Sequence, residues 1–200
     1  MAFFFADQGF DVWLNNSRGT RHSRSHRYYC PEEDLEFWDY SFYEMGKYDQ
    51  PALMEYVLEK SGVENLTYVG HSQGTSQIFS ALHENTEFFR KRVNLFIMLA
   101  PVARIDHTTV EQIHKLKENQ RGLDFLTSMG PELFSAPGTS GSLMSGFMKV
   151  TGGINITVKI IADDDPLKIS QTAVEQWMGH APAGTSFKCV DHFRQNIVSK

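Results

Sequence analysis

Residues 66–74 read Leu-Thr-Tyr-Val-Gly-His-Ser-Gln-Gly, and this stretch decides the fold class. Its first part, Leu66–Val69, is rich in apolar, aromatic and β-branched residues, which is typical of a strand. Its second part, Gly70–Gly74, has the Gly-x-Ser-x-Gly pattern of a sharp turn that carries a serine between a strand and a helix. The stretch therefore predicts a strand, a tight turn and a helix, in that order.

The sequence on either side continues the alternation of helices and strands. Downstream, Thr75, Ile78, Phe79 and Leu82 recur at the spacing of one helix face. Val93–Ala100 is almost continuously apolar, as in a strand covered on both faces, and Pro101 ends it. Upstream, the pattern predicts a helical stretch over roughly 37–60, stopped at Ser61-Gly62, and a short buried strand over 11–16 that follows a packed helix.

This alternation predicts an α/β fold with a mostly parallel sheet and helices on both of its faces. We expect residues 1–103 to form the central part of the core, which carries the turn at Ser72. Beyond residue 103 the sequence pattern changes, because 131–153 is rich in Gly, Ser, Met and Phe and has no clear hydrophobic period. We interpret 104–190 as a helical cap or lid inserted over the sheet, and 191–200 as a return toward the core.

Composition excludes some classes of partner. The 200 residues carry a net charge of -5, which argues against nucleic acid as a partner because binding phosphate needs clustered positive charge. No apolar run reaches the roughly 18 residues of a membrane-spanning helix. Cys30 and Cys189 have no metal-ligand spacing, and we expect two separate thiols. The sequons at Asn15, Asn65 and Asn155 matter only in a secreted chain.

Ser72 is the candidate nucleophile, because the turn would project its hydroxyl from the end of the sheet. We expect side chains at Gly70 or Gly74 to collide with neighbouring backbone in so tight a turn. The helix that begins near Gln73 would direct its N–H groups and positive dipole end at the site. The backbone N–H of Gln73 is therefore the candidate donor to an oxyanion.

A serine hydroxyl needs a base, and in this kind of fold the acid and then the histidine follow the serine along the chain. Asn155–Asp165 could be a strand that ends in Asp163, Asp164 or Asp165, with His180 or His192 as the base. The spacing disfavours this triad, since 15 or 27 residues after Asp165 leave little room for a helix, a strand and a loop. Asp191 and His192 are adjacent, so their side chains diverge.

Two further segments have both a structural and a functional interpretation. The cationic loop 18–29 could contact nucleic acid, but the acidic run Glu32–Asp34 follows it, and a loop that ion-pairs with its own domain is favoured. The second segment contains an apolar stripe that is either ordinary core or the face of a flexible lid in contact with a lipid–water interface. Its members are Leu133, Phe134, Leu143, Met144, Phe147 and Met148.

Two blocks of the sequence contain motifs that occur together in one known family. The first block lies between Phe5 and Ala103, and the second begins at Gly179. The motifs are Ala6–Leu14, Asn16–Gly19, Glu36–Trp38, Tyr43–Met45, Tyr48–Asp49, Tyr68–Gly74, Leu99–Ala103, Gly179–Ser186, Asp191–Phe193 and Gln195. In these motifs the sequence resembles the acid lipase family, the group that contains gastric and lysosomal acid lipases.

The resemblance implies a partial α/β-hydrolase fold that hydrolyses lipid esters such as triacylglycerols or sterol esters, without a cofactor or metal. It implies Ser72 as nucleophile and Gln73 as oxyanion donor, and a secreted or lysosomal location. The family's acid and histidine lie later than the Gly179–Ser186 block, and His192 matches a position that is not the base.

The chain departs from the family pattern in ways that affect activity. It lacks the earlier strands and the His-Gly loop that supplies a second oxyanion donor, and it ends before the family's acid and base. We therefore expect an incomplete lipase chain that is inactive by itself. Two alternatives stay open: a non-catalytic, lipid-binding protein of this fold, and an esterase for soluble esters.

Overall fold

The computed structural model describes residues 1–107, 120–128, 130–133 and 183–199. The chain divides into two compact units. The first unit comprises Met1–Arg18 and Phe42–Ala103, and the second comprises Gly19–Ser41 and Arg104–Lys200.

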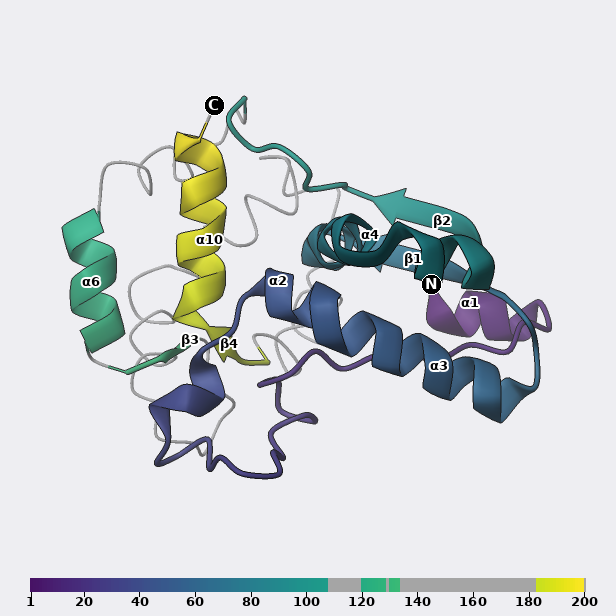
Figure 1. Ribbon diagram of the computed structural model, residues 1–200, viewed down its shortest axis with the longest axis horizontal. Coiled ribbons are helices and arrows are strands. Elements are labelled where there is room, and N and C mark those ends of the chain that lie inside the picture. The colour runs from purple at the N-terminus through teal and green to yellow at the C-terminus, as the bar shows by residue number, and fades with distance from the viewer. Residues whose placement is uncertain (108–119, 129, 134–182, 200) are drawn as a thin grey trace, which may run out of the picture. The chain divides into compact units, whose positions relative to one another are not determined.

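A parallel pair of strands forms the sheet of the first unit. Strand β1 (Leu66–His71) lies beside β2 (Val93–Leu99), with Tyr68 opposite Phe96 and His71 opposite Leu99 (Figure 1). Helix α4 (Gln73–Arg92) connects them, which parallel strands require because their ends are far apart. The predicted α/β class and parallel pairing are confirmed.

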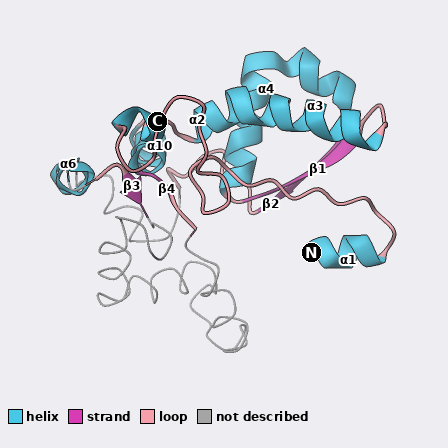
Figure 2. Ribbon diagram, turned by 90° about the horizontal axis from the view of Figure 1, so that it is seen from below, coloured by secondary structure: helices cyan, strands magenta, loops and turns pink. Residues whose placement is uncertain are grey.

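Helices cover the sheet pair on the side where α4 lies. Helix α3 (Gln50–Ser61) packs beside α4, and Figure 2 shows both on the same side of β1 and β2. The apolar core between these elements contains Ile78 and Ala81, both almost fully buried. Its buried members are Met54, Ile78, Ala81, Phe89 and Val93, and the half-buried residues packed against them are Leu66, Tyr68, Leu82, Phe88, Phe96 and Met98.

The predicted helical stretch over 37–60 is divided into short pieces. A 3₁₀ turn, η1 (Leu35–Trp38), is followed by α2 (Phe42–Glu44), the π-helical turn η2 (Met45–Asp49) and α3. Pro51 has no N–H to continue the helical hydrogen bonds, so the bonding pattern changes just before it. Helix α3 ends at Gly62, as the sequence predicts.

Helix α4 is broken at Asn85, whose backbone has φ -152° and ψ 72°. The side-chain Oδ1 of Asn85 accepts a 3.1 Å hydrogen bond from the backbone N–H of Phe88. This is the bond that an asparagine makes as the N-cap of a new helix. The helix therefore restarts at this point.

Three predictions for the first unit are wrong. Residues 11–16 form no strand, and Leu14 is 75% exposed. The physical reason is that a strand needs a partner, and within the described ranges no strand pairs with this segment. Helix α1 (Ala2–Asp7) forms, but none of its residues is buried. Strand β2 is not covered on both faces, since Leu95 is 53% exposed.

The second unit has helices α6 (Gln120–Ser128) and α10 (Phe187–Val198) and an antiparallel pair of short strands. Strands β3 (Glu132–Leu133) and β4 (Thr185–Ser186) pair with each other. Its buried apolar residues include Phe37, Trp38, Leu133, Phe187, Cys189 and Ile197. Apart from Leu133, the stripe assigned to a lid lies outside the described residues.

The cationic loop is tied to its own unit through Arg24, as expected. The guanidinium of Arg24 contacts a carboxylate oxygen of Glu132 at 2.5 Å and one of Glu32 at 3.0 Å, and it lies over the ring of Trp38 at 5.0 Å. These bonds raise the pKa of Arg24 against the opposing effect of burial. Cys30 and Cys189 are two separate thiols, which confirms that prediction.

In the part of the chain that the structure describes, no helix combines the length and the apolar character needed to cross a bilayer.

Candidate functional site

Ser72 lies at the apex of the turn between β1 and α4, and it is exposed. Its backbone has φ 51° and ψ -118°, a combination outside the left-handed helical region that non-glycine residues occasionally adopt. Such a conformation costs about 1–3 kcal/mol and persists only where neighbouring structure enforces it. The turn predicted from the sequence is therefore present, and it is strained at the serine.

Hydrogen bonds on both sides of Ser72 hold this conformation. Its backbone N–H donates to the carbonyl of Leu99 at the end of β2, at 3.0 Å. Its carbonyl accepts from the backbone N–H of Thr75 at 2.9 Å and from the hydroxyl of Thr75 at 2.6 Å. The residue after Leu99, Ala100, also has a positive φ of 47°, so two strained residues are adjacent in space.

The two glycines of the turn have different environments. A Cβ atom on Gly70 would lie 2.8 Å from Cε1 of Tyr68 and 3.3 Å from the backbone of Gly74, so the expected collision is confirmed there. At Gly74 a Cβ atom would meet only the Tyr68 hydroxyl, at 3.8 Å, which is an ordinary contact. The expected collision with neighbouring backbone at Gly74 is wrong, because no backbone atom outside its own helix and chain neighbours lies within 4 Å of such a Cβ.

Gln73 is the first residue of α4, so its backbone N–H belongs to the positive end of the helix dipole. This is the position expected of an oxyanion donor. The side-chain amide of Gln73 donates to the sulfur of Met45 at 3.6 Å. The side chain is thus engaged with η2.

A buried polar group supports α4 one turn further along. The amide of Gln77 donates to the hydroxyl of Ser17 at 3.1 Å and to the sulfur of Met45 at 3.2 Å, while its oxygen accepts from the amide of Gln50 at 2.7 Å. Gln50 is 1% exposed and Gln77 is 5% exposed. Sequence reasoning missed this group, because helical periodicity identifies apolar faces and gives no signal for paired amides.

Gly46 lets η2 approach α4 closely. A Cβ atom there would lie 2.3 Å from the carbonyl oxygen of Gln77 and 2.9 Å from the backbone nitrogen of Ala81. Only glycine therefore permits this approach of η2 to the helix that carries the turn.

The structure describes only some of the candidate acids and bases of the triad. Asp163, Asp164, Asp165 and His180 lie outside the described residues. His192 lies on α10 in the second unit, where its Nδ1 and the Ser41 hydroxyl are 2.9 Å apart. The neighbouring Asp191 accepts from Arg194 and from Gln195, both at 2.8 Å. The two side chains therefore have different partners.

The ionisation of Asp191 reflects those partners. Partial burial opposes its charged form, but the hydrogen bonds from Arg194 and Gln195 outweigh that effect and lower its pKa. No group of three or more His, Cys, Asp and Glu side chains suited to a metal ion occurs among the residues that the structure describes.

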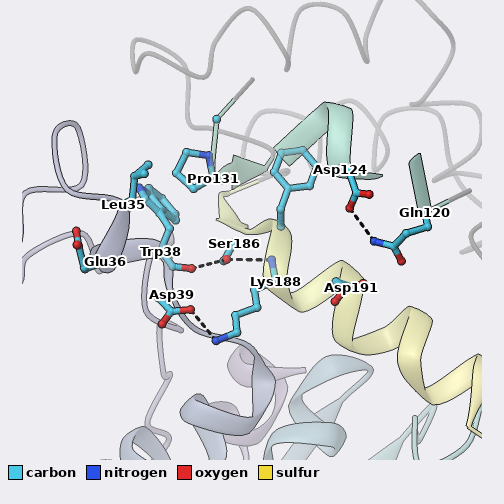
Figure 3. Close-up of a pocket in the computed structure, with 12 residues that line it drawn as sticks. Leu35, Glu36, Trp38, Asp39, Gln120, Asp124, Pro131, Ser186, Lys188 and Asp191 are labelled. Carbon is cyan, nitrogen blue, oxygen red and sulfur yellow. Dashed lines mark hydrogen bonds and ion pairs between the residues drawn. The ribbon is translucent and has the colours of Figure 1, made fainter. Parts of the chain in front are cut away.

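A pocket of about 860 Å³ lies within the second unit. Figure 3 shows Lys188 bonded to the carboxylate of Asp39 on one side of it, and Gln120 bonded to Asp124 on another. The hydroxyl of Ser186 donates to the carbonyl of Trp38 at 2.6 Å. The polar groups of the lining largely bond to one another, and Ser72 is not among them. The strained turn, and not this pocket, is the candidate site.

Comparisons with known proteins identify the fold family of the chain. A family model described as the alpha/beta hydrolase fold matches residues 2–145. Human gastric triacylglycerol lipase is 36% identical over 203 residues, which cover 100% of this chain and 50% of that protein. Lipase lipl-1 of Caenorhabditis elegans is 34% identical, covering 98% and 50%.

Human lipase member K is 32% identical over 206 residues, again covering 100% of this chain and 50% of that protein. The chain therefore spans about half the length of the curated relatives it matches.

Proposed function

The chain belongs to the α/β-hydrolase fold family, and from this premise we propose that it forms part of an acid-lipase-like serine ester hydrolase whose nucleophile is Ser72. The observation that carries the proposal is the strained, exposed Ser72 at the end of β1, followed directly by the first turn of α4. In this family a nucleophilic serine occupies such a turn.

The proposed reaction is acyl transfer. The Ser72 hydroxyl attacks the carbonyl carbon of an ester, and a histidine accepts its proton and passes it to the leaving alcohol. Water then hydrolyses the acyl-enzyme. The N–H of Gln73, at the positive end of α4, stabilises the negative oxygen of the tetrahedral intermediate.

Lipid esters are the proposed substrates. Support comes from the printed names of the relatives, two of which are lipases and one a triacylglycerol lipase. We include in the proposal a cap or lid within 104–190 that contacts a lipid–water interface.

The acid and base are taken from beyond residue 200, as the resemblance implies. Full activity is then expected only from a chain of the relatives' length. The 200-residue chain should be slower by roughly 10⁴- to 10⁶-fold, the loss expected when a catalytic triad is incomplete.

Covalent labelling with a fluorophosphonate probe tests the assignment of Ser72. The probe is applied to the full-length product of the gene, to its Ser72→Ala variant and to Ser76→Ala, in which a neighbouring serine that is 4% exposed is removed. We expect labelling of the unaltered protein and of Ser76→Ala, and none of Ser72→Ala. Absence of labelling in the unaltered, folded protein would support the non-catalytic, lipid-binding alternative.

A series of esters of increasing acyl length separates the lipase from the esterase for soluble esters. Higher turnover on long-chain esters, with a gain when an emulsion surface forms, is expected of the lipase. A preference for short soluble esters, without a gain at an emulsion surface, would contradict the lipase proposal.

A further inference from the structure

We infer that Thr75 is a positioning residue, which fixes the direction of the Gln73 N–H by holding the carbonyl of Ser72. The inference rests on the proposed function, because it assigns a role in the oxyanion site of that reaction. The Thr75 side chain touches neither the ester nor the reacting atoms, so its effect is exerted through the Ser72–Gln73 peptide.

The planar peptide bond between Ser72 and Gln73 couples the carbonyl of one residue to the N–H of the next. The carbonyl of Ser72 and the N–H of Gln73 belong to one trans peptide, so they point in opposite directions and rotate together. Whatever holds the Ser72 carbonyl therefore also sets where the Gln73 N–H points. The backbone conformation of Ser72 is strained, so neighbouring groups must hold it. The direction of the Gln73 N–H therefore depends on those groups.

Thr75 holds the carbonyl of Ser72 by two hydrogen bonds. Its backbone N–H donates to the Ser72 oxygen at 2.9 Å, and its hydroxyl donates to the same oxygen at 2.6 Å. The first bond is an ordinary feature of a helical first turn. The second bond depends on the side-chain hydroxyl, which threonine carries on Cβ. Serine is the only other standard residue with a hydroxyl on Cβ.

A second hydrogen bond fixes the direction of the hydroxyl hydrogen of Thr75. The oxygen of Thr75 accepts a 2.8 Å hydrogen bond from the backbone N–H of Val102. Since Val102 supplies the hydrogen of that bond, the hydroxyl's own hydrogen is directed to Ser72. Thr75 is 0% exposed, so water does not compete for either bond.

The same hydroxyl joins the strained turn at Ser72 to the segment that follows β2. Val102 lies two residues after Ala100, whose φ is 47°, and the carbonyl of Leu99 accepts the N–H of Ser72. The Val102 carbonyl in turn accepts from the hydroxyl of Ser76 at 2.9 Å. Thr75 and Ser76 thus both anchor Val102 to α4, but only Thr75 also contacts the Ser72 carbonyl.

This difference supplies a matched pair of variants. Thr75→Val removes the hydroxyl at nearly constant shape, while Ser76→Ala removes an equally buried hydroxyl bonded to the same residue, Val102. Thr75→Ser keeps the hydroxyl and serves as the rescue variant. Thr75→Ala gives the same comparison should the valine variant fail to fold.

The first measurement needs no activity. In the 200-residue chain, the ¹⁵N and ¹H chemical shifts of the Gln73 amide should change in Thr75→Val and stay near their original values in Thr75→Ser and Ser76→Ala. An unchanged Gln73 amide in folded Thr75→Val and Thr75→Ala would overturn the inference.

The second measurement is the rate of fluorophosphonate labelling at Ser72 in the full-length gene product, together with kcat and KM on a soluble ester. Loss of an oxyanion donor lowers kcat by about 10²- to 10³-fold. Because the Thr75 N–H remains, we expect roughly a tenfold fall in labelling rate and kcat for Thr75→Val, with KM unchanged. Thr75→Ser should stay within about twofold.

Equal labelling rates and kcat values in Thr75→Val and Ser76→Ala would show that the Thr75 hydroxyl only stabilises the turn. That result would overturn the inference. If the unaltered protein is not labelled at all, the proposed function fails instead. The amide measurement then still decides whether Thr75 holds the peptide.

Discussion

The hydroxyl of Tyr68 donates a 2.9 Å hydrogen bond to the carbonyl of Gly74, so strand β1 is bonded to α4 across the turn that connects them. The same side chain fills the space beside Gly70 that a Cβ atom would need. Tyr68 thus contacts both glycines of the turn at Ser72 and helps to hold the turn in place.

Tyr68 should make the folded chain sensitive to alkaline pH. Burial raises the pKa of Tyr68 to about 12, above the ordinary value near 10 of an unfolded chain. The contribution of Tyr68 to the free energy of unfolding is fully present below pH 10. It is lost as the pH rises toward 12, because the tyrosine of the unfolded state releases its proton first. This loss amounts to about 2–3 kcal/mol.

Urea unfolding of the unaltered chain and of Tyr68→Phe between pH 9 and 12 checks this expectation. All other titratable groups are the same in both proteins, so the difference between the two curves isolates Tyr68. Parallel curves would contradict the expectation.

Alanine at the two glycines of the turn should have opposite effects. Gly70→Ala places a methyl group 2.8 Å from the Tyr68 ring, and such overpacking costs about 1–3 kcal/mol. Gly74→Ala meets only an ordinary contact, and alanine is favoured over glycine in a helix by up to about 1 kcal/mol. The free energies of unfolding of both variants measure this, and similar losses for both would argue against the geometry.

The buried amide pair lends itself to a double-mutant cycle. Gln50→Leu leaves the oxygen of Gln77 without the donor it has now, which should cost about 1–3 kcal/mol. Gln50→Leu combined with Gln77→Leu replaces both partners by apolar groups and should recover part of that loss. Thermal unfolding of the four proteins gives the coupling between the two sites. A coupling near zero would mean that the two amides do not depend on each other.

In the second unit, Arg24→Met should be among the most destabilising single changes. It leaves the Glu132 carboxylate, whose side chain is 7% exposed, without its cation. Breaking a buried ion pair on one side costs about 3–5 kcal/mol, whereas replacing both partners is often neutral. The double variant Arg24→Met, Glu132→Met should therefore be more stable than Arg24→Met alone. Denaturant unfolding monitored by the fluorescence of Trp38, which lies under Arg24, reports on this unit when Trp13 and Trp177 are replaced by phenylalanine in all variants compared.

The elements around Ser72 were predictable because local patterns define them. The strand residues, the Gly-x-Ser-x-Gly turn and the apolar spacing from Ile78 onward are all readable over a few positions, and β1, the turn and α4 follow them. The break at Asn85 is not readable in this way, since asparagine also occurs within helices on exposed faces.

Segments whose structure depends on distant partners were predicted wrongly. Residues 11–16 have a strand-like composition, but pairing with another strand decides whether a strand forms. At the site, the motif indicates Ser72 and Gln73 as candidate residues, but it gives no signal for the groups that hold them in place. The hydroxyl of Thr75, expected to lie on an inner helix face, proves to bond to Ser72 and to Val102, which is 27 residues away.

The interruption of α4 at Asn85 bears on how this region can change during evolution. In an unbroken helix, inserting one residue rotates everything beyond it by about 100°, which would move Phe89 out of the core relative to Ile78. Because the helix restarts at Asn85, the two buried faces are set independently. Insertions and deletions at this point would leave the orientation of Ser72 intact, so we expect sequences of this family to vary in length there.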